Sequence, residues 1–226
     1  MCKVEGLEWI RLLYCYPEEI TDELIEVMAS EKKICHYIDM PIQHASDTVL
    51  KRMGRHTDLR SLEDTISRLR SRIPDIAIRT TLITGFPGER QEDQDILLGF
   101  VDKMEFDRLG VFTYSEEEDT PAAAMDDQIN EELKEKHRDE VMALQQEIAF
   151  EHALNMKGRV LDALVEGRLL DEGTYTARTY MDAPGVDGLL FFDSDRELMS
   201  GDMVKVRITG ANEYDLIGEL CDESAK

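Results

Sequence analysis

The segment Ile76–Glu89 holds the residues best suited to bind a ligand. It reads IAIRTTLITGFPGE, so a run of largely apolar, often β-branched residues leads into a loop with two glycines. This pattern predicts a buried parallel strand, a loop and then a helix, and α/β folds bind ligands at the carboxyl ends of such strands. Gly85 and Gly88 would let the backbone approach a flat ligand because they carry no Cβ. A ligand-free turn between strand and helix fits the same pattern.

The acidic charge of the chain narrows the range of partners. The 226 residues include 49 acidic and 26 basic side chains, which gives a net charge of −23. Proteins that bind nucleic acids present basic surfaces, so we expect direct RNA binding to be weak and a basic protein to be attracted. The charge is concentrated, with 13 acidic and 3 basic residues over 115–152. Solubility or adaptation to salt is the alternative explanation.

The sequence shows no sign of a membrane or secretory protein. It has no run of about 18 apolar residues, and its start, MCKVEGLEWIRLLYC, lacks the features of a signal peptide. We therefore expect a cytoplasmic protein. Its cysteines, Cys2, Cys15, Cys35 and Cys221, are scattered without metal-ligand spacing. They predict neither a disulfide framework nor a metal site, and Cys15 and Cys35 are expected to be buried in strands.

Strand and helix patterns alternate through the first half of the chain. We expect strands at 9–16, 34–42, 76–83 and 108–114, and helices after residue 17, at 46–53, at 59–72 and at 91–104. The apolar faces expected for three of these helices are Ile20, Leu24, Val27 and Met28; Leu62, Ile66, Leu69 and Ile73; and Ile96, Phe100 and Met104. The alternation predicts an α/β fold with a parallel sheet. Four strands cannot close an eight-stranded barrel, so we expect an incomplete parallel βα barrel, the back part of a larger one.

The second half changes from a long helix to a β-rich texture. Over 128–156 the residues Ile129, Leu133, His137, Val141, Leu144 and Ile148 recur every three or four positions. In this pattern His137 is expected to be a packing residue rather than a ligand. Strand patterns follow at 159–165, 174–180, 188–192, 203–209 and 213–220, which suits a small OB-like barrel. The expected domains are 1–127, a connecting helix at 128–154 and a β-barrel at 155–226.

Four segments in one order resemble the methylthiotransferase family of radical S-adenosylmethionine (SAM) enzymes. They read QHASD (43–47), YSEEEDTPAA (114–123), DAPGVDG (182–188) and NEYDLIG (212–218). They are most similar to the branch that modifies a ribosomal protein, because the tRNA-modifying branch usually carries an arginine-containing sequence after Tyr-Ser. The resemblance implies part of a radical SAM barrel followed by a terminal TRAM domain.

This resemblance also implies an activity. The family cleaves SAM reductively at a 4Fe–4S cluster, abstracts a hydrogen and inserts a methylthio group, here at the β-carbon of an aspartate in a small-subunit ribosomal protein. The implied cofactors are SAM and, in the full-length enzyme, 4Fe–4S clusters; the implied partner is a basic small-subunit ribosomal protein. The family holds the cluster with Cys-x-x-x-Cys-x-x-Cys, a motif that these residues lack. We therefore expect the chain by itself to be catalytically silent, and we expect a monomer.

The same resemblance implies a cofactor site at the strand ends. Gln43 and Ser46 would reach the ribose or the carboxylate of SAM, although a barrel-mouth amide and a plain helix N-cap are the alternatives. The residues expected to line the adenine pocket are Ile83, Gly85 and Phe86, with Phe112 and Tyr114 beside them unless these two are core aromatics.

Charged residues extend this predicted site. Arg79 lies in an otherwise apolar strand and requires an anionic partner. That partner would be the cofactor carboxylate, the substrate aspartate or an internal carboxylate. The run Glu116, Glu117, Glu118 and Asp119 would form a docking surface for the basic protein, or else a solvated acidic loop. No catalytic residue is identified.

Two classes of function therefore stay open. The first is an enzyme fragment of the ribosomal-protein methylthiotransferase type. The second is a non-catalytic acidic module that binds a basic ribosomal protein. A fragment of a tRNA methylthiotransferase is a third possibility, which the acidic terminal domain disfavours.

Overall fold

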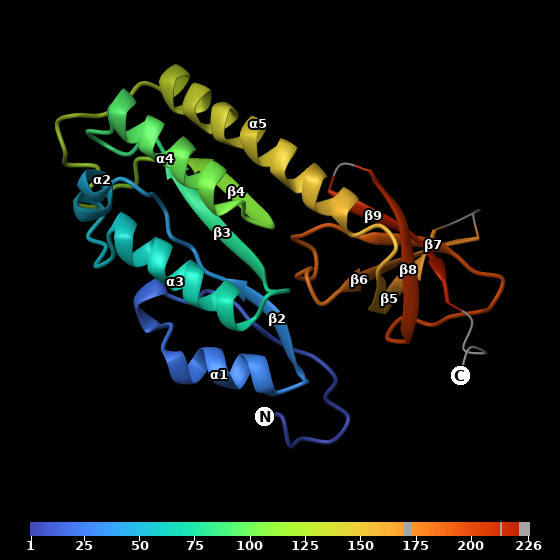
Figure 1. Ribbon diagram of the computed structural model, residues 1–226. Coiled ribbons are helices and arrows are strands. Elements are labelled where there is room, and N and C mark those ends of the chain that lie inside the picture. The colour runs from blue at the N-terminus through green and yellow to red at the C-terminus, as the bar shows by residue number, and fades with distance from the viewer. Residues whose placement is uncertain (170–172, 213, 222–226) are drawn as a thin grey trace. The chain divides into compact units, whose positions relative to one another are not determined.

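The computed structural model describes residues 1–169, 173–212 and 214–221. Tertiary contacts divide the chain into two compact units, Met1–Ile148 and Ala149–Lys226, drawn in Figure 1. Within the described ranges, no helix has the length and apolar character that crossing a membrane requires.

The first unit is built on a four-stranded parallel sheet in the order β1-β2-β3-β4. Its strands are β1 (Ile10–Leu12), β2 (Ile34–Asp39), β3 (Ala77–Thr84) and β4 (Arg108–Thr113). Its helical elements are η1 (Pro17–Glu19), α1 (Asp22–Ser30), α2 (Asp47–Arg52), α3 (Leu59–Arg72), α4 (Gln91–Met104) and the beginning of α5 (Glu131–Asn155). The predicted α/β class, with an incomplete parallel βα barrel, is confirmed.

The core of this unit lies between one face of the sheet and the helices (Figure 1). Along β3 the side chains of Ile78, Thr80 and Leu82 are buried, whereas Arg79, Thr81 and Ile83 alternate with them and remain partly exposed. Period-two alternation in a strand places these two sets on opposite faces. The buried set packs with the helices, so the partly exposed set is left to line the other face.

The helices begin and end where local chemistry dictates. The observed bounds of α3 and α4 agree with the ranges expected from the sequence. At the start of α3 the Asp58 carboxylate accepts a hydrogen bond from Ser61 N at 2.7 Å, and the Ser61 hydroxyl completes a capping box. Two side chains expected on apolar faces, Val27 and Ile96, are exposed instead.

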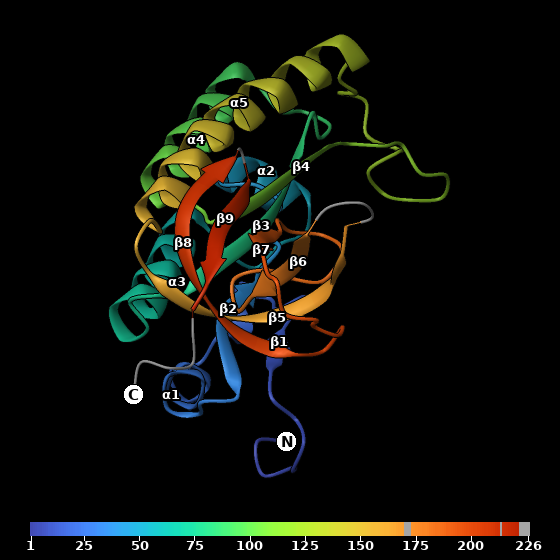
Figure 2. The ribbon, with the colours of Figure 1, turned by 90° about the vertical axis from the view of Figure 1, so that its right-hand side faces the viewer.

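The second unit is a closed barrel in the order β5-β6-β7-β9-β8, which Figure 2 shows. Its strands are β5 (Val160–Arg168), β6 (Thr174–Thr179), β7 (Leu190–Asp193), β8 (Met203–Asn212) and β9 (Asp215–Leu220). Tyr175 and Phe192 stack in its interior with ring centroids 5.8 Å apart. The predicted small five-stranded barrel is confirmed, although the expected last strand began at residue 213, which lies outside the described residues.

Candidate functional site

Most of the predicted cofactor residues lie at or just after the carboxyl ends of parallel strands, whereas Arg79 lies near the beginning of β3. Gln43 lies beside the end of β3, where its N–H donates to Thr81 O at 2.9 Å and its carbonyl accepts from Ile83 N at 2.8 Å. Its φ of 73° is in the left-handed region, which is uncommon for a residue other than glycine. Such strained residues concentrate at functional sites, so this geometry supports the position that the sequence suggested.

A buried carboxylate fixes the glycine-rich loop after β3. Glu89 is only 4% exposed, and its Oε2 accepts hydrogen bonds from Gly85 N at 2.8 Å and Phe86 N at 3.2 Å. Its Oε1 lies 2.7 Å from Nδ1 of His137 on α5. Burial raises the pKa of Glu89, while the hydrogen bond to His137 lowers it. The carboxylate therefore ties the loop to a helix that comes about fifty residues later.

The two loop glycines are required by neighbouring side chains of the protein itself. Gly85 and Gly88 have φ values of +72° and +81°. A Cβ on Gly85 would lie 2.1 Å from Cγ of Lys134, and a Cβ on Gly88 would lie 2.5 Å from Cζ of Arg52. The expectation that these glycines open the backbone to a flat ligand is therefore corrected, because the space that each Cβ would fill belongs to Lys134 and Arg52. A cofactor contact by Gly85 remains a prediction.

A second buried group, His44, lies next to this carboxylate. Its Nδ1 accepts a hydrogen bond from Ser46 N at 2.9 Å, which places the proton of the neutral ring on Nε2, 3.7 Å from Glu89 Oε2. Burial lowers the pKa of His44 to about 4. The ring is thus neutral near pH 7 and acts as a hydrogen-bonding group in the wall of the site.

Ser46 stands at the N-cap position of α2, as the sequence suggested, but its side chain does not cap the helix. The hydroxyl instead donates to Oδ1 of Asp93 at 2.5 Å, and Oδ2 of Asp93 accepts from Arg90 N at 2.9 Å. Ser46 therefore connects α2 to the beginning of α4. A contact of Ser46 with SAM stays a prediction.

Arg79 has an internal anionic partner. Its Nη1 donates to Oδ1 of Asp39 at 2.8 Å, and Asp39 is 1% exposed. The two residues are register partners on β2 and β3. Of the partners that the sequence left open, the structure supplies the internal carboxylate, and contact of Arg79 with a cofactor or substrate carboxylate stays a prediction.

The predicted aromatic residues fall into two environments. Phe86 and Tyr114 pack edge to face with ring centroids 5.2 Å apart, in a small cluster that partly buried Ile83 also contacts. Phe112 pairs with Ile83 across the sheet, so the two share a face, and Phe112 is 63% exposed. The structure thus brings Ile83, Phe86 and Tyr114 together and leaves the ring of Phe112 accessible beside them.

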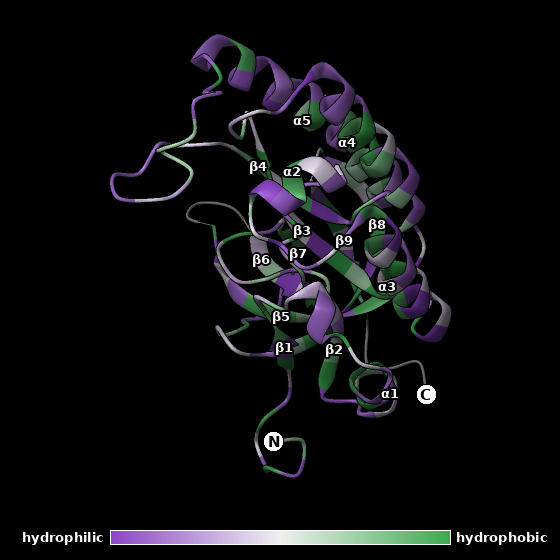
Figure 3. Ribbon diagram, turned by 90° about the vertical axis from the view of Figure 1, so that its left-hand side faces the viewer, coloured by the Kyte–Doolittle hydropathy of each residue, from purple (hydrophilic) through white to green (hydrophobic). Residues whose placement is uncertain are grey.

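The acidic run follows β4 at the same edge of the sheet. The side chains of Glu116, Glu117, Glu118 and Asp119 are exposed, in a loop that projects from β4 in Figure 2 and is strongly hydrophilic in Figure 3. The structure agrees with an accessible acidic surface near the predicted site. Whether that surface docks a protein remains a prediction.

Sequence reasoning missed three of the residues that organise this site. Glu89, His44 and Asp39 were given no role, although the first ends the glycine-rich loop and the last is the lone acid of an apolar strand, opposite the lone base Arg79. His137 was expected to be a packing residue. It is buried as expected, and it also bonds Glu89.

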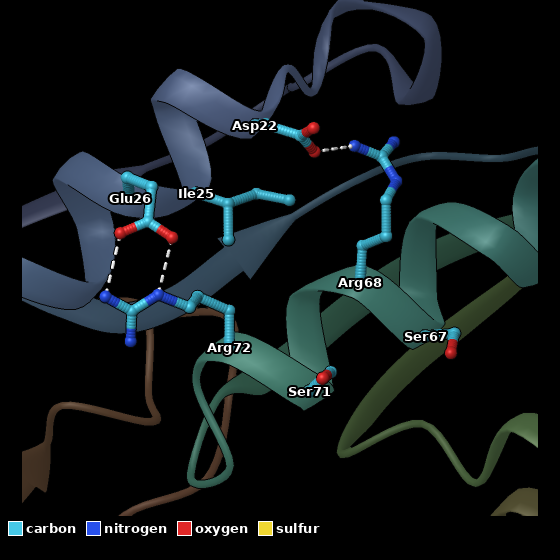
Figure 4. A pocket seen from close by; sticks show the side chains of 7 residues that line it. All are labelled: Asp22, Ile25, Glu26, Ser67, Arg68, Ser71 and Arg72. Atoms are coloured by element: carbon cyan, nitrogen blue, oxygen red, sulfur yellow. Dashed lines mark hydrogen bonds and ion pairs between the residues drawn. The ribbon is translucent and has the colours of Figure 1, made fainter.

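A groove of about 460 Å³ lies between α1 and α3, away from the strand ends (Figure 4). Two ion pairs cross it, Arg68 with Asp22 at 2.6 Å and Arg72 with Glu26 at 2.5 Å. The arginines therefore already have carboxylate partners. Exposed pairs of this kind contribute little stability, and we regard the groove as part of the packing between the two helices.

The residues of the site suit one of the two implied cofactors, SAM, better than the other, the 4Fe–4S cluster. Across the described residues, no three His, Cys, Asp or Glu side chains gather in a way that could hold a metal ion. Cys2, Cys15 and Cys35 of the first unit form no disulfide and do not gather at one place, so a 4Fe–4S cluster does not fit the described residues. SAM fits better, since a strained polar residue, Gln43, and an accessible aromatic face flank the strand ends.

Comparison with known proteins defines the class. Residues 2–100 match the model of the radical SAM superfamily, and residues 158–221 match the TRAM domain. Among solved structures, the chain is similar in fold to coproporphyrinogen III oxidase (HemN) from Escherichia coli, a radical SAM enzyme. That match has a TM-score of 0.52 and 20% identity and covers 63% of this chain and 33% of the other. The class is thus a radical SAM barrel segment followed by a TRAM barrel.

Curated relatives narrow the family further. The chain is 60% identical over 218 residues to ribosomal protein uS12 methylthiotransferase RimO of Lachnoclostridium phytofermentans, covering 96% of this chain and 50% of that protein. It is 49% identical over 220 residues to the RimO protein of Desulfitobacterium hafniense, covering 97% of this chain and 49% of that protein. The chain therefore belongs to the radical SAM methylthiotransferase family, with RimO-type proteins as its relatives. It spans about half the length of the curated relatives that it matches.

Proposed function

We propose that this chain is the C-terminal part of an enzyme that methylthiolates the β-carbon of an aspartate in the small-subunit ribosomal protein uS12. The observation that carries the proposal is the 60% identity to a uS12 methylthiotransferase over 96% of the chain. The order of a radical SAM segment and a TRAM barrel supports it. Fold likeness by itself would not, because one fold hosts many activities.

In this proposal the strand ends would bind SAM, whose one-electron reductive cleavage in the cluster-bearing enzyme would supply the radical that removes a substrate hydrogen. Gln43, held in a left-handed conformation at the end of β3, would hydrogen-bond the polar part of the cofactor. The partly exposed Ile83 and the exposed Phe112 lie on one face of the sheet and would pack against its adenine ring. Glu89 would act indirectly, by fixing the amides of Gly85 and Phe86. The cluster would be bound by cysteines that are not part of this chain.

The partner in this proposal is a basic polypeptide. Glu116–Asp119 are exposed beside the strand ends, and the chain carries a net charge of −23. Opposite charges accelerate encounter and favour a basic partner over nucleic acid. We accordingly propose a protein substrate in place of RNA, a cytoplasmic site of action and a monomeric enzyme.

A chimeric enzyme tests the activity. The chain would be joined to the N-terminal half of the Lachnoclostridium phytofermentans relative, reconstituted anaerobically with iron and sulfide, and incubated with uS12, SAM and dithionite. We expect uS12 to gain one methylthio group in exchange for one hydrogen, with the methyl group supplied by SAM and the sulfur by the sulfide of the reconstitution. The intact relative is the positive control, and the 226-residue chain without its fusion should yield neither cluster absorbance nor 5′-deoxyadenosine. An active relative with an inactive, folded chimera would point to the non-catalytic binding module instead.

Paired variants test the proposed contacts in that chimera. Phe112→Ala should weaken SAM binding several-fold, whereas Phe150→Ala, at another exposed phenylalanine, should leave it unchanged. Glutamine at Glu116, Glu117 and Glu118 should raise KM for uS12 more than glutamine at Glu132, Glu135 and Glu147. The two triple variants change the net charge equally, and all six side chains are exposed. An equal rise in KM for both triple variants would mean that the overall acidic charge attracts uS12 and that residues 116–118 form no specific docking surface.

A further inference from the structure

The segment after β1 presents two tyrosines to solvent. The sequence suggested a buried strand through Tyr16, but β1 ends at Leu12. Tyr14 is 80% exposed and Tyr16 is 58% exposed. Because the strands are parallel, this segment lies at the same edge of the sheet as Gln43 and the loop after β3. The candidate site therefore has an aromatic flank that the sequence did not predict.

Tyr14 adopts a conformation that costs free energy. Its φ of 58° is left-handed, where the Cβ of an L-residue is crowded by its own backbone. The exposed ring adds little to the core, so packing does not explain the choice of tyrosine. Strain at an exposed, bulky residue is a feature of ligand clamps and active sites.

Asp39 holds Tyr14 in this conformation. Its Oδ2 accepts from Tyr14 N at 3.0 Å, and its main-chain carbonyl accepts from Cys15 N at 2.9 Å. The left-handed turn lets these two successive amides point at one residue. Oδ1 of the same carboxylate accepts from Arg79, so the buried carboxylate is anchored on both sides. Loss of the turn would leave a buried oxygen without this donor, which is costly.

The surroundings indicate what the ring of Tyr14 binds. Tyr16, two residues after Tyr14, already binds a cation on its ring. The guanidinium of Arg55 lies over this ring, 5.5 Å from its centroid. The acidic run Glu116–Asp119 is exposed at the same edge of the sheet. Aromatic faces attract cations, and the carboxylates after β4, three strands away from β1, add an attractive field for a basic chain that crosses the strand ends. Both features fit a lysine or arginine side chain.

We propose that Tyr14 is a substrate-contacting residue whose ring binds a lysine or arginine side chain of a basic polypeptide, and that Asp39 is the positioning residue that holds it. This inference rests on the proposed function in one respect, the basic polypeptide substrate. It adds a specific contact to an electrostatic attraction that would otherwise be diffuse.

The test measures the affinity of the 226-residue chain for a short peptide of alternating arginine and serine by titration calorimetry. Tyr14→Gly should weaken binding about three- to tenfold, the range of a cation–π contact at a partly exposed site. Its melting temperature should be equal or higher, since glycine accepts a left-handed φ without strain. Tyr14→Phe should bind like the wild type. The matched control is Glu105→Gly at α4, which relieves a left-handed φ of 44° and should leave peptide affinity unchanged.

Asp39→Asn tests the positioning role. It should weaken peptide binding in the wild-type background and have little further effect in Tyr14→Gly, because a positioning residue acts through the ring it holds. Additive losses would overturn that role. Unchanged affinity of Tyr14→Gly would overturn the contact, and a Tyr14→Phe loss equal to that of Tyr14→Gly would assign it to the hydroxyl.

Two further outcomes keep this inference distinct from the proposed function. If the glutamine variants of Glu116–Glu118 lose binding while Tyr14→Gly does not, only the tyrosine contact is overturned. If the wild-type chain does not bind the basic peptide at low salt, the protein partner and the contact fail together. Tighter binding of a single-stranded RNA, lost in Tyr14→Gly, would overturn the contact in favour of base stacking.

Discussion

Single residues in the loop after β3 determine its shape. Glu89 accepts hydrogen bonds from two successive amides, and Gly85 leaves room for the side chain of Lys134. Lys134 in turn donates to the carbonyl of Tyr114 at 3.0 Å. The loop, β4 and α5 are therefore joined through a few atoms, and small changes there should propagate.

Gly85→Ala should destabilise the first unit by about 2–4 kcal/mol, the combined cost of a left-handed alanine and of a methyl group forced against Lys134. Gly54→Ala is the matched control, since Gly54 has the same φ of +72° with nothing near its Cβ position. It should cost only about 1 kcal/mol. Urea unfolding followed through the fluorescence of Trp9, the single tryptophan, reports on this unit. Equal losses would show that Lys134 moves aside without cost.

The pH dependence of stability should contain a component from His44. Its folded pKa is about 4 against an ordinary 6.5, so between these values the unfolded chain binds a proton that the folded chain does not. This contribution is present above pH 6.5 and is lost as pH falls to 4, with a total of about 3 kcal/mol. The raised pKa of Glu89 acts in the opposite direction, adding stability as pH falls. The measurement must therefore compare variants.

His44→Gln should flatten the loss of unfolding free energy between pH 6.5 and 4 relative to the wild type. His56→Gln, at an exposed histidine, should leave the wild-type profile unchanged. Denaturant unfolding at half-unit pH steps, followed through Trp9, measures both. A His44→Gln profile parallel to that of the wild type would contradict the buried, neutral state of this ring.

The helices and strands of the first unit were predictable where periodicity and caps agree. The range 59–72 has a capping aspartate and a stripe of Leu62, Ile66 and Leu69, all of them buried. The prediction that Val27 and Ile96 lie on buried helix faces was wrong. Each of them is exposed and lies one position before a residue that packs in the core, Met28 or Leu97. A short helix can rotate by one residue without changing its apolar content, and only its contacts decide which face is buried.

Asp58→Ala should lower the melting temperature of the first unit, because it removes the carboxylate that accepts from Ser61 N at the start of α3. Asp102→Ala, near the end of α4, is the control. It should be neutral or slightly stabilising, since a negative charge is unfavourable near a helix C-terminus. Thermal unfolding by circular dichroism compares the two, and a neutral Asp58→Ala would mean that solvent replaces the cap.

At the scale of the whole molecule, the two units differ in whether their sheet is open or closed. The first has an open four-stranded sheet with β1 and β4 at its edges, whereas the strands of the second close on themselves. Open edges of buried-type strands are unprotected. Closure of the barrel removes such edges, so the second unit is expected to be the more stable of the two on its own.

Limited proteolysis should therefore leave a resistant fragment that begins near residue 155 and carries the β-barrel. The first unit should be cut earlier, with initial cleavage in the exposed loop that includes 115–119. Mass spectrometry of a time course identifies the fragments. Equal survival of both units, or survival of the first unit after loss of the barrel, would contradict this order.

The sequence by itself determined the order of elements, the α/β class, the closed β-barrel and the family, because these follow from periodicity, turn residues and ordered motifs. It also located the strand-end residues Gln43, Gly85 and Tyr114. The tertiary structure decided the contacts between residues far apart in sequence. It paired Arg79 with Asp39, joined Glu89 to His137 and turned Tyr14 outward. Such pairings depend on which strands and helices become neighbours in space, and no local pattern in the sequence encodes that.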